Sequence, residues 1–234
     1  MIKRMLIGEF KRIFRDKMYV FFMLYPVFIV AVLLWLVPYI DQRLGEVASN
    51  IVSLVFILMT PFMFGAISAF TILDDRDDHV FDSLKVTPLK VSTYLAIKLI
   101  MTYLFGFVTT LLILIINKNL SISPLDMFLI ATLSSLSAPT ITLLVNAFSS
   151  NKVEGFVIMK SSGLLMMLPI ASLFVTNWTE VFLGIIPGFW PARLISMNLL
   201  PLEFFMPNYL YFILGTLVNL AYIIVFFRLV KKRI

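Results

Sequence analysis

Six long apolar stretches, separated by short polar connections, constrain this chain more than any other feature. A helix needs about 20 apolar residues to cross the hydrocarbon core of a bilayer, and the stretches that approach this length are 18–40, 51–73, 95–116, 127–148, 156–175 and 209–229. Of the 234 residues, 61% are hydrophobic and only 14% are charged, so too few polar side chains remain to cover a water-soluble globule. We therefore predict an all-α membrane protein with six transmembrane helices, which form one transmembrane domain over residues 1–234.

Two further segments lie outside these six spans. Residues 1–17 combine apolar side chains at helical spacing with Lys and Arg on the other side, which predicts an amphipathic helix in the membrane interface. Residues 176–207, before the last span, contain an apolar stretch that Pro187, Gly188 and Pro191 interrupt. We expect a re-entrant or interfacial segment here, which a membrane tolerates where protein covers the backbone.

The distribution of Lys and Arg predicts the orientation of the chain. If the amino terminus is cytoplasmic, only Arg43, Lys118 and Arg193 of the 19 basic residues lie on the outer side. Cytoplasmic connections of membrane proteins carry the excess of Lys and Arg. Six spans then place both termini in the cytoplasm, together with the connection 74–94 between the second and third spans.

That connection is strongly acidic. Within the stretch FTILDDRDDHVFDSLKVTPLK, five aspartates occupy nine positions, namely Asp74, Asp75, Asp77, Asp78 and Asp82. One interpretation is a membrane prenyltransferase, in which Asp74, Asp75 and Asp78 would bind magnesium on a diphosphate, because hard cations prefer oxygen ligands. Such enzymes use two acidic motifs, and the other acids at 126, 154, 180 and 203 stand singly, which counts against this interpretation.

A second interpretation concerns the residues that follow the first acids. Val80, Phe81 and Leu84 fall on one face of a short helix predicted at 77–86, where Asp77 would help to start the helix and Pro88 would stop it. This short helix has no core of its own to bury these apolar side chains. Either a groove on a partner protein covers them, or they rest on the bilayer interface or on the amino-terminal helix.

The segment Asp77 to Leu89 resembles the connection after the second span in permeases of the type-2 ABC exporter family, which includes bacterial drug-export permeases. The family pattern is roughly Glu-x-Gly-Thr-hydrophobic-Glu-x-Leu-x-x-Thr-Pro-Leu. Asp77 and Asp82 stand in place of the two glutamates, His79 replaces the glycine, and the matching residues are Leu84, Thr87, Pro88 and Leu89. The layout of an amphipathic helix, six spans and a broken outer segment is also similar to that family.

This resemblance implies a membrane subunit that does no chemistry and binds no cofactor. ATP and magnesium would belong to a separate ABC ATP-binding subunit, in keeping with the lack of a Gly-x-x-x-x-Gly-Lys-[Ser/Thr] loop in the sequence. The connection 74–94 would hold a coupling helix that docks on that subunit. The docking residues implied are Asp77, Val80, Phe81, Asp82, Leu84 and Pro88.

The resemblance also implies a homodimer, or a heterodimer with a sister permease, in the cytoplasmic membrane of a bacterium, with no role for nucleic acid. A hydrophobic drug or lipid-like cargo would pass between the two protomers. The path residues implied are Thr60, Phe64, Ser68, Ser162 and Met166. Lys160, inside the fifth stretch, could bind an anionic substrate, reach the inner surface or pair with Glu154. An assembly factor or immunity protein without transport remains a further alternative.

Overall fold

The computed structural model describes residues 17–88, 90–117, 122–171, 175, 177–200 and 203–233. The predicted interfacial helix at 1–17 and Leu89 of the family pattern therefore lie outside the described residues, apart from Lys17. The helices are α2 (Lys17–Leu44), α3 (Glu46–Asp77), α4 (Val80–Lys85), α5 (Val91–Ile116), α6 (Pro124–Ser135), α7 (Ser137–Phe148), α8 (Lys152–Ala171), the 3-10 helix η2 (Trp178–Ile185), α9 (Phe189–Leu199) and α10 (Asn208–Arg233).

Five segments of the described chain are helical, long and apolar enough to cross a membrane: α2, α3, α5, α6 together with α7, and α10. The prediction of a multi-pass, helical membrane protein is therefore confirmed. α8 covers most of the predicted span 156–175 and packs against α3 and α7, but it is not among these five. Several helices also extend beyond the predicted spans, and α3 in particular continues from Glu46 to Asp77.

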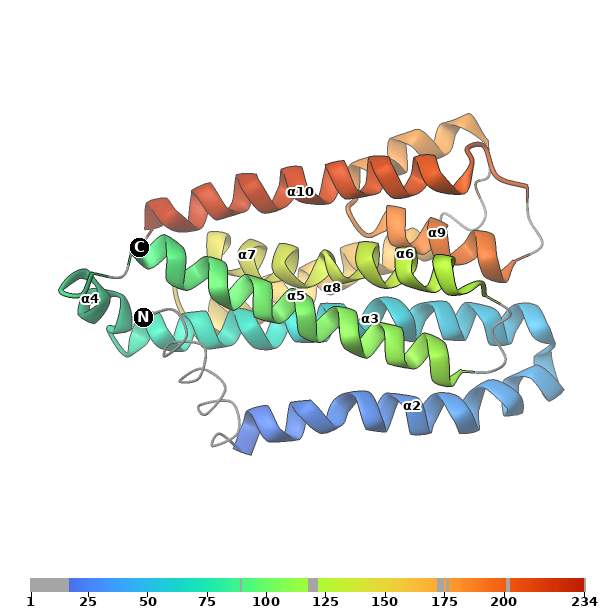
Figure 1. The fold of residues 1–234 in the computed structure, drawn as a ribbon, viewed down its shortest axis with the longest axis horizontal. Coiled ribbons are helices and arrows are strands. Elements are labelled where there is room, and N and C mark those ends of the chain that lie inside the picture. Colours follow the sequence, from blue (N-terminus) through green and yellow to red (C-terminus); the bar gives the residue numbers. More distant parts are fainter. Residues whose placement is uncertain are drawn as a thin grey trace.

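The bundle has two distinct ends. In Figure 1, α2 and α10 lie on opposite sides, with α3, α5 and α7 between them. One end holds α4, the start of α5 and the end of α10, and the opposite end holds the turn between α2 and α3 together with α9. The short connections therefore gather at two levels about one helix length apart, as expected for a chain that crosses a membrane repeatedly.

The predicted span 127–148 consists of two helices. α6 ends at Ser135 and α7 begins at Ser137, so the helix is interrupted at Leu136. Pro139 follows one turn later and lacks the backbone N–H that would donate to the carbonyl of Ser135. We attribute the interruption to this missing hydrogen bond.

α3 and α7 approach each other closely. Thr142 donates a hydrogen bond to the carbonyl of Gly65 at 2.9 Å, and Asn146 donates to the carbonyl of Ala69 at 3.1 Å. Gly65 allows this approach, because a Cβ atom there would lie 2.5 Å from the carbonyl oxygen of Ala138. Small residues with polar partners are the usual means of holding helices together in a bilayer, where apolar burial adds little.

The predicted outer segment 176–207 folds into η2 and α9. The irregular backbone between these two helices is covered by α10: Asn219 donates to the carbonyl of Pro187 at 3.1 Å, and Tyr222 donates to that of Ile185 at 2.8 Å. In addition, Trp190 of α9 donates to the carbonyl of Gly184 at 2.8 Å. The backbone carbonyls at this break thus find partners within the protein, which is what a non-helical segment at membrane depth requires.

Candidate functional site

α4 and its two flanking turns differ from the single helix predicted at 77–86. α3 continues through Asp77, and α4 begins only at Val80. Between them His79 adopts the left-handed conformation, with φ 54° and ψ 28°, and makes no side-chain cap for α4. The prediction that Asp77 starts the helix is therefore wrong. His79 occupies the position where the resembled pattern has glycine, the residue that adopts positive φ without strain.

Phe81 is the anchor of α4. It is only 4% exposed and packs into a cluster formed by the adjoining ends of α3, α5, α7 and α10, where its ring meets that of Tyr94 edge-on at 6.1 Å. Phe81 is therefore covered neither by a partner's groove nor by the bilayer interface, the alternatives given from sequence, since four helix ends of the chain together bury it. Phe81 thus attaches α4 to the bundle and is not available as a free docking side chain.

The other predicted docking residues lie nearer the surface. Val80 and Leu84 are half-buried, and Leu84 packs against the same cluster as Phe81. Asp82 and Pro88 are exposed, and Val86 is 89% exposed. We define the free face of α4 as its exposed side chains together with two exposed residues of the turn that follows: Asp82, Ser83, Lys85, Val86 and Pro88.

Charges on this free face are paired locally. The Nζ atom of Lys85 donates to Asp82 at 2.9 Å, and Nδ1 of His79 lies 3.3 Å from the second oxygen of the same carboxylate. The hydrogen bond from Lys85, followed by that from His79, lowers the pKa of Asp82. Asp82 is therefore ionised at neutral pH and holds the ammonium group of Lys85 beside α4.

The acid Asp75 is completely buried. Its carboxylate forms an ion pair with Lys98 of α5, which is itself 7% exposed, and accepts a hydrogen bond from the hydroxyl of Tyr94 at 2.8 Å. A buried carboxylate is tolerated only when charge and hydrogen bonds compensate its lost hydration. Asp75 thereby fixes the end of α3 to the start of α5, on either side of α4.

The neighbours of Asp75 connect α3 to the turn between α7 and α8. Asp74 forms an ion pair with Lys152, the first residue of α8. Arg76 donates to the carbonyl of Ser149 at 3.0 Å. The hydrogen bond that Lys152 donates to Asp74 and the charge of that carboxylate raise the pKa of Lys152, and the charges of Asp77 and Asp78 add to this effect. Both connections at this end of the bundle are therefore attached to the last turn of α3.

This division of the acids bears on the metal interpretation. Asp74, Asp75 and Asp82 pair with three different lysines, from α8, α5 and α4. Within the described ranges, which include all five aspartates of the cluster, no three His, Cys, Asp or Glu side chains are grouped to hold a metal ion. The arrangement gives no support to a prenyltransferase site, because the carboxylates do not converge on a common point.

The predicted path residues have separate surroundings within this chain. Phe64 stacks on Phe105 of α5 at 6.2 Å. Thr60, Ser68 and Ser162 are buried, and the hydroxyl of Ser162 donates to the backbone of its own helix. The side chain of Met166 lies outside the described part. A path between two protomers through these residues stays a prediction.

Lys160 lies deep along α8. Two glycines show which parts of α3 lie beside α8. A Cβ on Gly155 would meet Leu73, whereas one on Gly163 would meet Phe62. Lys160 lies between these levels, is exposed, and places its ammonium 5.6 Å from the ring centre of Phe156. The alternative partner Glu154 instead accepts hydrogen bonds from the residues that precede α8.

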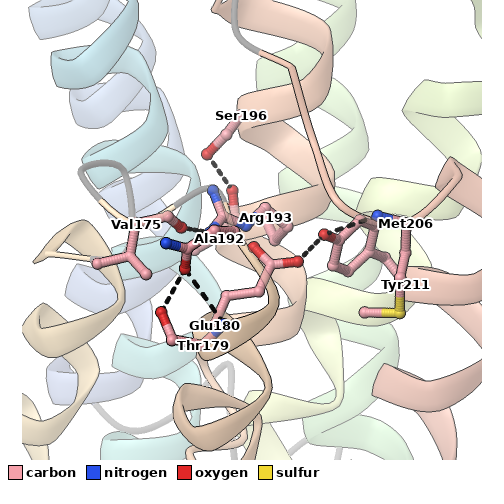
Figure 2. Close-up of polar contacts among 9 residues, drawn as sticks. Val175, Thr179, Glu180, Ala192, Arg193, Ser196, Met206 and Tyr211 are labelled. Carbon is pink, nitrogen blue, oxygen red and sulfur yellow. Dashed lines mark hydrogen bonds and ion pairs between the residues drawn. The ribbon is translucent and has the colours of Figure 1, made fainter.

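A second buried ion pair lies at the opposite end of the bundle. Glu180 of η2 and Arg193 of α9 are both fully buried and pair with each other (Figure 2). Tyr211 of α10 donates to Glu180, and Arg193 donates to the carbonyl of Val175. The guanidinium also lies 5.4 Å from the ring centre of Phe189. This network joins η2, α9 and α10, and so it fixes the two helices of the outer segment to each other and to α10.

Sequence reasoning missed this network. It treated Arg193 as one of three basic residues on the outer side and Glu180 as an isolated acid. The signal was available, because an arginine and a glutamate within one apolar segment each need a partner, and the segment contains only these two charges between residues 177 and 200.

Comparison with known proteins identifies relatives. A family model described as "Fluoroquinolones export permease protein Rv2686c-like" matches residues 9–227. Two curated proteins, the fluoroquinolones export permease proteins MT2760 and Rv2686c of two Mycobacterium tuberculosis strains, are each 30% identical over 145 residues. The alignment covers 59% of this chain and 56% of each relative, so the chain spans a little over half the length of the curated proteins it matches.

Proposed function

Because the chain belongs to the Rv2686c-like fluoroquinolone export permease family, we propose that it is the membrane-spanning subunit of an ATP-driven exporter. It would act as a dimer, or beside a sister permease, in the cytoplasmic membrane. A separate ABC ATP-binding subunit would bind ATP and magnesium. The proposed cargo is a hydrophobic or amphipathic drug, because the curated relatives are named for fluoroquinolone export.

The proposed topology has six spans, with α8 as the fifth. α8 runs beside α3 and α7 and is 20 residues long, which suffices to cross the hydrocarbon core. With both termini in the cytoplasm, the end of the bundle that carries α4 faces the cytoplasm. This orientation is supported by the basic last turn of α10, which contains Lys231, Lys232 and Arg233.

The single observation that carries the proposal is the attachment of α4. This short helix exposes a polar face, yet its inner side is fixed to four helices by Phe81. The preceding turn of α3 is itself fixed by the Asp75–Lys98 pair and the Arg76–Ser149 hydrogen bond. A force on its free face would therefore reach the bundle without being absorbed by a flexible loop. We propose that α4 is the coupling helix and that its free face contacts the ATP-binding subunit.

This corrected docking surface differs from the one predicted from sequence. Asp82 and Pro88 remain in it, whereas Phe81 acts from the inner side of α4. Val80 and Leu84 are half-buried and would contribute only their accessible edges. The path between protomers, with Thr60, Phe64, Ser68, Ser162 and Met166, remains part of the proposal, and closure of the ATP-binding subunits would shift the spans between inward-open and outward-open states.

Co-expression and co-purification with a candidate ABC ATP-binding subunit test the proposal. Val86→Asp places a charge on the free face of α4 without touching the core, because Val86 is 89% exposed. We expect it to release the ATP-binding protein and to restore cellular accumulation of a fluorescent fluoroquinolone, with unchanged thermal stability. Leu44→Asp is the matched control: Leu44 is 73% exposed at the other end of the bundle. Retention of the complex by Val86→Asp would show that α4 is not the docking element.

A further inference from the structure

A cavity of about 440 Å³ opens where α4, α5 and α10 meet. Its walls include Lys85 at the end of α4, Lys90 immediately before α5, and Lys231 in the last turn of α10. The apolar side chains of Leu84 and Val91 complete part of the wall. Three ammonium groups from three elements thus line one cavity of a size that can admit a phosphate group with its substituents.

The cavity carries a net positive charge. Lys85 is paired with Asp82 at 2.9 Å, so one of the three ammonium groups is already compensated. Asp74 is bound to Lys152 and Asp75 to Lys98, and no acidic residue is among those that line the cavity. Lys90 and Lys231 are exposed, and among the described residues neither lysine forms an ion pair with a carboxylate.

The start of α5 adds to the preference of the cavity for an anion. Its N-cap residue, Lys90, makes no side-chain cap hydrogen bond, and the first turn contains no acidic residue. The initial N–H groups of a helix have no partner within the helix, and the helix dipole adds partial positive charge there. Val91 and Ser92, the first residues of α5, line the cavity, so the same space receives the lysine charges and the positive end of a 26-residue helix.

The surroundings identify the source of the anion. The cavity lies where two candidate membrane spans end, α5 at its first residue and α10 at its last turn. Further along the same helices the side chains are apolar and exposed, including Ile100 and Leu104 on α5 and Val225 on α10. A molecule with a phosphate at this level and hydrocarbon beyond it matches both features. Basic recesses between spans bind lipid headgroups in this manner.

We propose that this cavity binds the phosphate of an anionic phospholipid headgroup, held by Lys90 and Lys231. The lipid would join the turn after α4 to the last turn of α10, two elements that also meet through the cluster containing Phe81 and Val230. Its binding would stabilise the position of α4 relative to α10. Two residues of the free face of α4, Lys85 and Pro88, also line this cavity, so the lipid would border the proposed contact with the ATP-binding subunit. The inference does not depend on the identity of the cargo.

The direct test is lipid binding to the purified full chain in detergent, measured by native mass spectrometry. Phosphatidylglycerol is titrated against phosphatidylcholine, which carries the same phosphate but no net charge. We expect phosphatidylglycerol to bind preferentially. Lys90→Gln and Lys231→Gln should each weaken its binding about fivefold, since one lysine near an anionic lipid surface contributes about that factor.

Lys232→Gln is the matched control. Lys232 is adjacent on α10, is also exposed, and loses the same charge, but it does not line the cavity. It should change the affinity by less than about twofold, because screening weakens charges outside the site. An equal effect of Lys231→Gln and Lys232→Gln would overturn the proposal in favour of diffuse attraction, and equal binding of phosphatidylcholine would overturn it as well.

A third measurement distinguishes a bound lipid from a bound soluble anion. Inorganic phosphate at millimolar concentration should not displace phosphatidylglycerol, because it lacks the acyl chains that follow α5 and α10. If phosphate alone raises the thermal stability of the chain as much as phosphatidylglycerol does, and Lys231→Gln removes that effect, the ligand is a soluble anion and the lipid assignment is wrong. Loss of phosphatidylglycerol on assembly with an ATP-binding protein would also contradict the proposal, because it would make that protein the natural occupant.

Discussion

Gly65→Ala is the sharpest test of how the bundle is held together. Gly65 lies at the crossing of α3 and α7, where an added Cβ would lie 2.5 Å from the carbonyl oxygen of Ala138 and 3.0 Å from its Cα. All the nearest atoms belong to backbone, so no side chain can rotate away. The two helices must therefore separate at the crossing by roughly half an ångström or more to restore ordinary contact distances.

The cost has two parts. Overpacking in a tightly packed site costs about 1–3 kcal/mol. Separation also lengthens the hydrogen bonds from Thr142 to Gly65, now 2.9 Å, and from Asn146 to Ala69, now 3.1 Å, and each such bond between membrane helices contributes about 0.6 kcal/mol. We therefore expect Gly65→Ala to reduce the free energy of unfolding by roughly 2–4 kcal/mol.

The assay is unfolding in mixed micelles, followed by tryptophan fluorescence. Gly163→Ala serves as control, because its Cβ would lie 3.6 Å from the ring of Phe62, an ordinary contact; the free energy of unfolding should change by no more than about 0.5 kcal/mol. Thr142→Val isolates the hydrogen bond and should cost about 0.6 kcal/mol. Equal stability of the Gly65→Ala and Gly163→Ala variants would refute the close approach of α3 and α7.

Three further predictions concern other sites. Lys98→Met leaves the carboxylate of Asp75 buried without its ion-pair partner and should cost about 3–5 kcal/mol in unfolding free energy, whereas the double variant Asp75→Leu/Lys98→Met should recover most of that loss. His79→Gly relieves a left-handed backbone conformation and should raise the unfolding free energy by about 1 kcal/mol, while His79→Ala, which keeps the strain, should not. Arg193→Lys cannot reproduce the planar contacts of the guanidinium with Glu180 and its other neighbours, and a loss of about 2 kcal/mol is expected; an unchanged melting temperature would argue against the buried network.

The helical, multi-pass character of the chain could be predicted from sequence because it depends on composition and length alone. Twenty consecutive apolar residues leave no other conformation that satisfies the backbone in a bilayer. The helix ends were less predictable. α3 extends to Asp77 because Asp74 and Asp75 find cationic partners on α8 and α5, and those partners are distant in sequence.

The candidate site, too, could be predicted from sequence only in part. The free face of α4 follows from local polarity, and Asp82, Lys85 and Pro88 were recognisable from their spacing. Burial of Phe81 was not predictable in this way, since its cluster combines residues from α3, α5, α7 and α10. Local spacing specifies which side chains share a helix face, but it does not specify which distant helix ends converge on that face.

The attachments of the last turn of α3 have a mechanical consequence. Asp74 and Arg76 connect it to the turn between α7 and α8, and Asp75 connects it to α5. The two connections at this end of the bundle are therefore attached to the same turn of α3. We expect a displacement of α4 to be transmitted through this turn to α8, so spin labels on α4 and α8 should keep a constant separation while both change their distance to α9.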